Sequence, residues 1–187
     1  ILRIDVSKNS LLERLDIRGN LIESIDLSNN PKLKYLNINQ NNYQGNLDTS
    51  TQKDLMGLMV SKNPGLESLD LSNNEKLLWF DADFCGGLRN IDLSNQKELG
   101  FLSLRQTNIN ELKVSSSNDL VYFDCTLSTN LNCIEVSQFQ QDNQINNASI
   151  GSKTTDFTVN FDPFRAQIFS SIIWTIDSDD FYSLNCN

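Results

Sequence analysis

The chain has 187 residues, of which 39% are hydrophobic, so it can bury a substantial core. Its formal net charge of -9 and pI near 4.4 argue against nucleic-acid and anionic-membrane partners, because both require clustered Lys and Arg. It contains no histidine, which excludes Ser-His-Asp and Cys-His nucleophiles and histidine-ligated zinc.

An apolar pair with one residue between its members recurs every eleven residues, with two intervals of ten. The pairs are Ile4/Val6, Leu15/Ile17, Ile25/Leu27, Leu36/Ile38, Leu47/Thr49, Leu58/Val60, Leu69/Leu71, Phe80/Ala82, Ile91/Leu93, Leu102/Leu104, Leu112/Val114, Phe123/Cys125 and Ile134/Val136. Self-similarity over this length predicts a solenoid of stacked coils. The first pair belongs to the second half of a repeat, so we expect the array to extend upstream of Ile1.

The pairs alternate between two classes, which makes the true repeat about 22 residues long. In the first class a leucine precedes the pair by three places, and a polar residue or cysteine closes the motif. The leading leucines are Leu12, Leu33, Leu55, Leu77, Leu99 and Leu120, and the closing residues are Asn20, Asn41, Asn63, Cys85, Thr107 and Ser128. This L-x-x-L-x-L-x-x-(N/C/T/S) pattern resembles the leucine-rich repeat. The resemblance implies an α/β-type, mostly β solenoid: a right-handed horseshoe of about six coils with a concave parallel sheet.

The second class reads Ile/Leu-Asp-Leu/Val-Ser, and its serine recurs without change. The serines are Ser7, Ser28, Ser50, Ser72, Ser94, Ser115 and Ser137. Ser and Asn side chains bond nearby backbone, so these halves should form the back of each coil as short extended or 3₁₀ segments. A parallel β-helix has coils of similar length, but it would not need two such different half-coils.

A column of carboxylates follows the same back segments. Its members are Asp5, Asp26, Asp48, Asp70, Asp92 and Glu135, interrupted by Lys113. Calcium collects carboxylate oxygens, but its ligands normally converge, whereas a single file does not. We therefore favour a role in closing each turn and expect neither a metal nor a cofactor.

On the strand after each leading leucine, side chains alternate, so the outward residues of successive coils form three columns. The first column is Arg14, Tyr35, Gly57, Trp79, Phe101 and Tyr122. The second column is Asp16, Asn37, Met59, Asp81, Ser103 and Asp124. The third column is Arg18, Asn39, Ser61, Asp83, Arg105 and Thr126.

Four of the six first-column residues are aromatic, which favours a recognition surface with rigid apolar area beside oriented polar groups. The alternative is that the aromatic rings pack on one another and shield the sheet. Phe84 and Leu127, just beyond the strands, enlarge the apolar area. The candidate ligand-binding residues are Tyr35, Trp79, Phe101, Tyr122, Asn37, Asn39, Asp81, Asp83, Arg105 and Asp124.

An extracellular protein or a polysaccharide could use this surface. A protein would be anchored by the aromatic side chains, whereas a polysaccharide would stack its sugar rings on them and bond to the Asn and Asp side chains. An enzyme is a third interpretation, because Asp81 and Asp83 are spaced loosely as the carboxylate pair of a glycosidase. We disfavour it because an open surface offers no evident means of raising the pKa of one carboxyl group, and we expect a noncatalytic binding module.

The four cysteines divide by position. Cys85 and Cys125 occupy a closing slot and a core slot, where a thiol acts as a small hydrophobe. A bridge between Cys133 and Cys186 would tie the end of the chain to the solenoid. The alternative is two further buried thiols, which a cytoplasmic location would favour.

The period ends after Val136, so we assign residues 1–136 to the repeat array and 137–187 to a capping segment. No apolar run approaches the ~20 residues of a membrane span. The stretch Asn130-Leu-Asn-Cys-Ile-Glu-Val, with the downstream Trp174-Thr-Ile-Asp and Cys186, resembles the C-terminal end of secreted Bacteroidetes leucine-rich repeat proteins with short internalin-like repeats. This resemblance implies a secreted or cell-surface bacterial binding protein, and it agrees with the Cys133 to Cys186 bridge.

Overall fold

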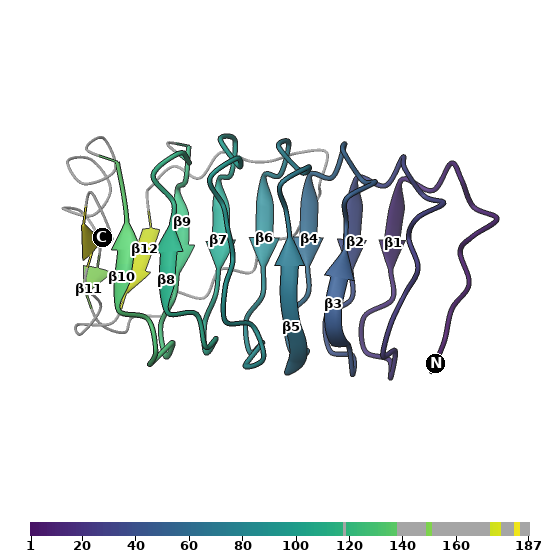
Figure 1. Ribbon diagram of the computed structural model, residues 1–187, viewed down its shortest axis with the longest axis horizontal. Coiled ribbons are helices and arrows are strands. Elements are labelled where there is room, and N and C mark those ends of the chain that lie inside the picture. The colour runs from purple at the N-terminus through teal and green to yellow at the C-terminus, as the bar shows by residue number, and fades with distance from the viewer. Residues whose placement is uncertain (118, 138–148, 151–172, 177–181, 184–187) are drawn as a thin grey trace.

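The computed structural model describes residues 1–117, 119–137, 149–150, 173–176 and 182–183. In this part the chain is a mostly β solenoid of about six turns, whose strands lie side by side along its length (Figure 1). Every strand pairing is parallel, as the repeat predicts. There is no helix in the described residues of the length and apolarity needed to cross a membrane.

One face carries an eight-stranded sheet to which each coil contributes a short strand. Its order is β1 (Arg14–Asp16), β2 (Tyr35–Asn37), β4 (Gly57–Met59), β6 (Trp79–Asp81), β7 (Phe101–Ser103), β9 (Tyr122–Asp124), β12 (Ile173–Ile176) and β11 (Ser149–Ile150). The first six strands are those predicted to follow the leading leucines. The segment predicted to cap the array lies mostly outside the described residues, so the cap and its boundary stay predictions.

The opposite face carries the short extended segments that the second half-repeat predicts. They are β3 (Gln44–Asp48), which pairs with β5 (Gly65–Asp70), and β8 (Glu111–Lys113), which pairs with β10 (Cys133–Glu135). β13 (Tyr182–Ser183), from the segment after the repeats, adds a third strand beside β10. Figure 1 shows β3, β5, β8 and β10 in front of the larger sheet. The side chains of the apolar pairs therefore point into the space between the two faces of each coil.

The core is the stack of these inward side chains. Leu36, Leu58, Phe80 and Leu102 are fully buried on successive coils, and burial of each such side chain is worth about 1.5–3 kcal/mol. Thr49, the polar exception in the series, is also buried, and its hydroxyl donates to Asn74 Oδ1 at 2.8 Å. A threonine is tolerated at this apolar position of the repeat because its buried hydroxyl has a hydrogen-bond partner.

The closing positions of the repeat form the predicted hydrogen-bonding column. Asn63 donates from Nδ2 to the carbonyls of Ile38 and Val60 at 2.9 and 2.7 Å, and its Oδ1 accepts from the amide of Tyr43 at 3.1 Å. The Cys85 thiol approaches the carbonyl of Val60 at 3.2 Å. Asn63 and Cys85 therefore each contact the preceding coil, whereas Thr107 bonds its own turn and Ser128 of the following coil.

A second buried polar column lies in the back turns and was not predicted. Its members are Asn30, Gln52, Asn74, Gln96 and Ser117. Asn74 is typical, since its Nδ2 donates to the carbonyls of Thr49 and Gln52 at 3.1 and 2.8 Å. These residues recur about every 22 positions in the sequence. The column was not predicted because its members differ in type and lie among other polar turn residues.

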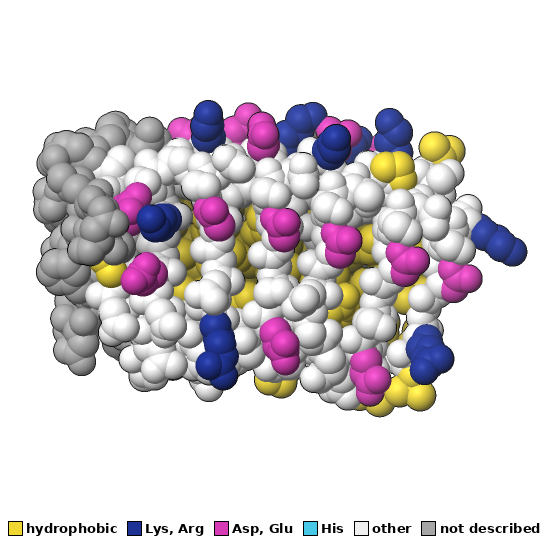
Figure 2. Space-filling model, in the orientation of Figure 1, with side chains coloured by type: hydrophobic (Ala, Val, Ile, Leu, Met, Phe, Trp, Pro, Cys, Tyr) yellow, Lys and Arg dark blue, Asp and Glu magenta, His cyan; other side chains and the backbone are white. Residues whose placement is uncertain are grey.

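The back-face aspartates close turns, as predicted. Asp5, Asp26, Asp48, Asp70 and Asp92 each accept a hydrogen bond at 2.8–2.9 Å from the amide of the serine two residues later. These bonds with serine lower the pKa of each carboxyl group. Figure 2 shows the resulting row of acidic side chains. Within the described residues, no group of three or more His, Cys, Asp or Glu side chains is arranged to hold a metal ion.

Candidate functional site

The outward side chains of the eight-stranded sheet fall into the columns that the sequence predicts. Arg14, Tyr35, Gly57, Trp79, Phe101 and Tyr122 are direct partners across successive strands. The second column pairs in the same way, from Asp16 to Asp124. The predicted register is therefore confirmed over six coils.

Three aromatic side chains of the first column, Trp79, Phe101 and Tyr122, form a continuous stack that we call the aromatic ladder. The ring centroids of Trp79 and Phe101 are 3.6 Å apart and their planes differ by 7°. Those of Phe101 and Tyr122 are 4.3 Å apart with an interplanar angle of 3°. The rings thus pack on one another, as one interpretation of the sequence held, yet all three remain partly exposed.

The geometry of the aromatic ladder determines what it can offer a ligand. Phe101 has a neighbouring ring on each side, so its two faces are covered and its edge remains. Face-to-face packing also holds each ring in place. The aromatic ladder is consequently a rigid apolar ridge rather than a row of open ring faces.

Part of the predicted surface is less exposed than expected. Tyr35 is 5% exposed, Asn37 8% and Asp124 7%, so the expectation that these side chains are open to solvent is wrong. Tyr35 lies outside the aromatic ladder, since Gly57 separates it from Trp79, and it instead lies 5.9 Å from the Arg14 guanidinium. The physical reason is strand spacing, because in-register side chains about 4.8 Å apart cover one another.

A polar network runs beside the aromatic ladder. Ser61 donates through its hydroxyl to Asp81 Oδ1 and accepts from the amide of Asp83 at 2.9 Å. The Ser103 hydroxyl and the Arg105 amide both donate to Asp83 Oδ1, at 2.7 and 2.9 Å. Two carboxylates are thereby held on adjacent columns by hydroxyl and amide donors.

Other predicted polar residues have local structural partners. Asn37 accepts from the amide of Asn39 at 3.1 Å, and Asn39 accepts from the amide of Ser61 at 2.7 Å. Asp124 accepts from the Thr126 amide at 3.0 Å and lies 3.7 Å from Arg105 Nε. These side chains shape the strand ends, whether or not a ligand also contacts them.

The two carboxyl groups next to the aromatic ladder have perturbed acidity. Burial, reinforced by the charge of Asp81, raises the pKa of Asp83 to about 6. Burial also raises the pKa of Asp81, against hydrogen bonds that favour its charged form. Within the described residues neither carboxylate forms an ion pair.

The expectation that nothing on this surface could raise the pKa of a carboxyl group is therefore wrong. Burial between strands does so at Asp83. A raised pKa is one requirement of a general acid, but it also arises wherever a carboxylate lacks a cation. Both aspartates lie on one strand and its extension, and their Oδ1 atoms are engaged by donors of the sheet.

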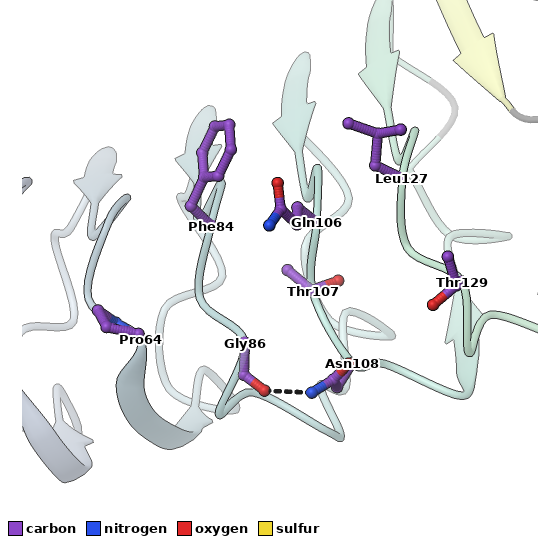
Figure 3. A pocket seen from close by; sticks show the side chains of 8 residues that line it. All are labelled: Pro64, Phe84, Gly86, Gln106, Thr107, Asn108, Leu127 and Thr129. Atoms are coloured by element: carbon purple, nitrogen blue, oxygen red, sulfur yellow. Dashed lines mark hydrogen bonds between the residues drawn. The ribbon is translucent and has the colours of Figure 1, made fainter.

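A hollow of about 520 Å³ opens beyond the ends of β6, β7 and β9. Phe84, Gln106 and Leu127 line it in a row, and Pro64, Thr107 and Asn108 line it farther from the strands (Figure 3). The sequence indicated Phe84 and Leu127 as additional apolar surface, but it gave no sign of the hollow.

The three residues of that row share an unusual backbone conformation. Their φ angles are +59° at Phe84, +53° at Gln106 and +63° at Leu127, and Gly19 takes φ +69° at the equivalent place in the first coil. The left-handed region costs an ordinary side chain roughly 1–2 kcal/mol, whereas glycine adopts it freely. Two of these coils therefore hold a bulky apolar side chain, Phe84 or Leu127, where glycine would be least strained.

The remaining predicted site concerns cysteine. Cys85 and Cys125 are free and buried, and burial raises the pKa of the Cys85 thiol to about 12, so it is unreactive at neutral pH. Cys186 lies outside the described residues. The Cys133 to Cys186 bridge therefore stays a prediction.

No family model and no curated protein matches the chain. Among solved structures, the functional domain of InlJ from Listeria monocytogenes is similar, with a TM-score of 0.66 and 26% sequence identity. The similarity covers 72% of this chain and 32% of that chain, so this chain spans about a third of the neighbour. The neighbour is a leucine-rich repeat internalin.

The fold is a leucine-rich-repeat-like solenoid. This agrees with the repeat read from the sequence and with the parallel sheet. The InlJ domain includes a cysteine ladder, whereas the six closing positions of this chain hold one cysteine, Cys85. Solenoids of this kind are typically noncatalytic binding modules.

Proposed function

We propose that the chain is a noncatalytic module that binds a protein partner through the aromatic ladder and the polar groups beside it. The observation that carries this proposal is the partly exposed stack of Trp79, Phe101 and Tyr122 on three neighbouring strands. Aromatic side chains are enriched at the energetic centres of protein interfaces, where they provide apolar contact at small entropic cost.

The rigidity of the aromatic ladder supports this role. Ordering a free side chain at an interface costs about 0.5–1.5 kcal/mol. Rings already stacked at 3.6 and 4.3 Å lose little further freedom when a partner covers them. Asp83 and Arg105 lie beside the rings and would orient the partner.

The same stacking makes a polysaccharide a weaker candidate. A sugar ring packs on an open aromatic face, and the faces of Phe101 are covered by its neighbours. Edge contacts suit the side chains of a protein better.

We place the module on the bacterial cell surface or in the secreted fraction. The support is the sequence resemblance to secreted leucine-rich repeat proteins and the structural similarity to an internalin domain.

The test compares wild type with a Trp79/Phe101/Tyr122 triple alanine variant against two probes: extracted cell-surface proteins and a glycan panel. A matched control replaces three exposed residues of the turns, Lys53, Glu75 and Lys97, with alanine. We expect the first variant, if still folded by circular dichroism, to lose protein binding at least tenfold while the control keeps it. Equal protein binding by a folded triple variant would remove the proposed site. Wild-type binding to glycans alone, lost in the triple variant, would favour the polysaccharide.

A further inference from the structure

The hollow beyond the strand ends is lined by apolar groups that solvent reaches. Leu127 is 52% exposed, and Phe84 is partly exposed. Its volume of about 520 Å³ lies within the 300–1,000 Å³ typical of ligand pockets, so it can accept one or two side chains. Because its lining residues follow three neighbouring strands, it suits a segment of polypeptide lying across the strand ends (Figure 3).

The backbone supplies a second, independent observation. Phe84 and Leu127 have φ angles of +59° and +63°, which strain the backbone of a residue with a bulky side chain. A coil that only needed to turn at this position would be more stable with glycine. Gln40, Lys62 and Gln106 show that polar side chains also fit this row. Apolar residues occupy this position only after β6 and β9, the outer two of the three strands whose ends border the hollow.

Next to the hollow is the Asp83 carboxylate, which forms no ion pair with any described residue. Asp83 accepts from the Ser103 and Arg105 donors through Oδ1, and no donor among the described residues bonds its Oδ2. Groups of both signs lie around it. Asp81 and Asp124 repel its charge. Arg105 Nε lies 3.7 Å from Asp124 Oδ2, and the charge of Lys62 acts on Asp81.

The carboxylate and the hollow belong to one surface. The amide of Arg105 donates to Asp83 Oδ1 at 2.9 Å, and the carbonyl of Arg105 accepts from the amide of Phe84 at 2.7 Å. One residue of β7's extension thus holds both features in place, at the end of the aromatic ladder's strands.

We infer that the partner docks through a segment that carries a Lys or Arg beside an apolar side chain, the cation meeting Asp83 Oδ2 and the apolar group entering the hollow between Phe84 and Leu127. This inference rests on the proposed function and specifies the chemistry of its partner. Charge complementarity supports it, because a cation supplied by the partner would relieve the repulsion among Asp81, Asp83 and Asp124.

The test selects binders from a displayed library of random twelve-residue peptides on the whole chain. Selected peptides are then synthesised and their Kd values measured against wild type, Asp83→Asn and Leu127→Ser. Matched controls are Asp119→Asn, which removes an exposed carboxylate elsewhere, and Leu11→Ser, which removes a leucine that is 80% exposed. Circular dichroism checks that each variant is folded.

We expect the enriched peptides to hold Lys or Arg within three places of Leu, Met or Phe. Asp83→Asn and Leu127→Ser should each raise the Kd at least fivefold, while the controls change it less than twofold. Binding to wild type should also tighten between pH 5 and 7.5, as Asp83 ionises, and this dependence should be absent in Asp83→Asn.

The inference would be overturned by selected peptides without a cation or by no enrichment at all. It would also be overturned if both variants bound the peptides with the wild-type Kd. The proposed function fails separately. If the peptides bind both variants normally but lose affinity for the Trp79/Phe101/Tyr122 variant, the aromatic ladder remains the site and only the inferred partner chemistry is wrong.

Discussion

Asp83 shows how a residue with an ordinary sequence context acquires unusual chemistry. It follows a strand whose neighbours, about 4.8 Å away, cover much of its side chain, and it lies beside Asp81. Burial and like charge both favour its neutral form, which is why its pKa rises to about 6.

This shift makes the stability of the protein depend on pH in a defined direction. Asp83 is protonated in both states below about pH 4, whereas between about pH 4 and 6 the folded state holds its proton and the unfolded state releases it. The free energy of unfolding contributed by Asp83 therefore falls across this window, by at most about 3 kcal/mol. Asp83→Asn lacks this loss, and its amide oxygen can still accept the Ser103 and Arg105 bonds.

Denaturant unfolding of wild type and Asp83→Asn at pH 4, 5, 6 and 7 measures this difference. We expect the variant to gain stability relative to wild type as the pH rises. The exposed Asp119→Asn substitution should show no such trend. A wild-type-to-variant difference that is constant from pH 4 to 7 would mean that Asp83 ionises normally in the fold.

At the residue scale, the sequence predicts direction but not depth. Alternation along a strand places Trp79, Phe101 and Tyr122 on the outer face, and the register confirms this. It could not predict that Asn37 and Asp124 would be buried on that face, because their exposure depends on the length and packing of side chains one coil away.

Between elements, the coils approach closely where small residues allow it. A Cβ at Gly87 would lie 2.6 Å from the carbonyl oxygen of Leu66 and 2.8 Å from that of Pro64 in the preceding coil. A Cβ at Gly86 would meet nothing within 4 Å. The turn therefore has room for a side chain at Gly86 but not at Gly87.

We therefore predict that Gly87→Ala destabilises the protein by about 2 kcal/mol, because backbone atoms of two coils must separate. Gly86→Ala should be neutral or stabilising by up to about 1 kcal/mol, through a less flexible unfolded chain. Thermal and denaturant unfolding of the pair checks this. Equal effects would indicate that the coils are farther apart at this turn than the structure has them.

The polar columns join the elements in another way. The Asn63 side chain bonds three carbonyls and one amide, all buried, so Asn63→Ala leaves four backbone groups without that partner. We expect a loss of about 3 kcal/mol in the free energy of unfolding. Asn73→Ala, at an exposed turn position, should change it by less than about 0.5 kcal/mol. A loss below about 1 kcal/mol for Asn63→Ala would contradict the structural role of the column.

Elements were predicted well where the repeat carries the information. The hydrogen-bonding column of closing residues, such as Asn63, was predicted because its members share one motif position. The back column, including Asn74 and Gln52, was missed because amides of different length can reach the same carbonyls, so its members do not look alike in sequence.

For the whole molecule, the 22-residue period predicts the parallel solenoid and its order, because each coil can bury its apolar pair only against its neighbours. Hollows at strand ends and the pKa values of individual groups depend on several coils at once, so the period does not predict them. The period ends at Val136, so it predicts no coil for the residues that follow.

The proposed bridge between Cys133 and Cys186 is testable on the whole chain. Alkylation of the unreduced, denatured protein should label Cys85 and Cys125 alone. In the chain-entropy model, a bridge closing this loop contributes about 4 kcal/mol of stability, so reduction should lower the unfolding midpoint. Four labelled cysteines in protein exported to an oxidising compartment would remove the bridge and the support that it gives to a surface location.

The central claim is that a protein partner contacts the outer face of the eight-stranded sheet. The most direct measurement places a photo-crosslinking amino acid at Arg105, beside the aromatic ladder, and in a second protein at Glu67, an exposed residue of β5 on the opposite face. After irradiation with the same cell-surface protein extract, cross-linked partners are quantified by mass spectrometry. We predict a specific cross-linked protein from position 105 that is absent from position 67 and is lost in the Trp79/Phe101/Tyr122 variant. Equal cross-linking from both faces, or cross-links from position 67 alone, would contradict the account.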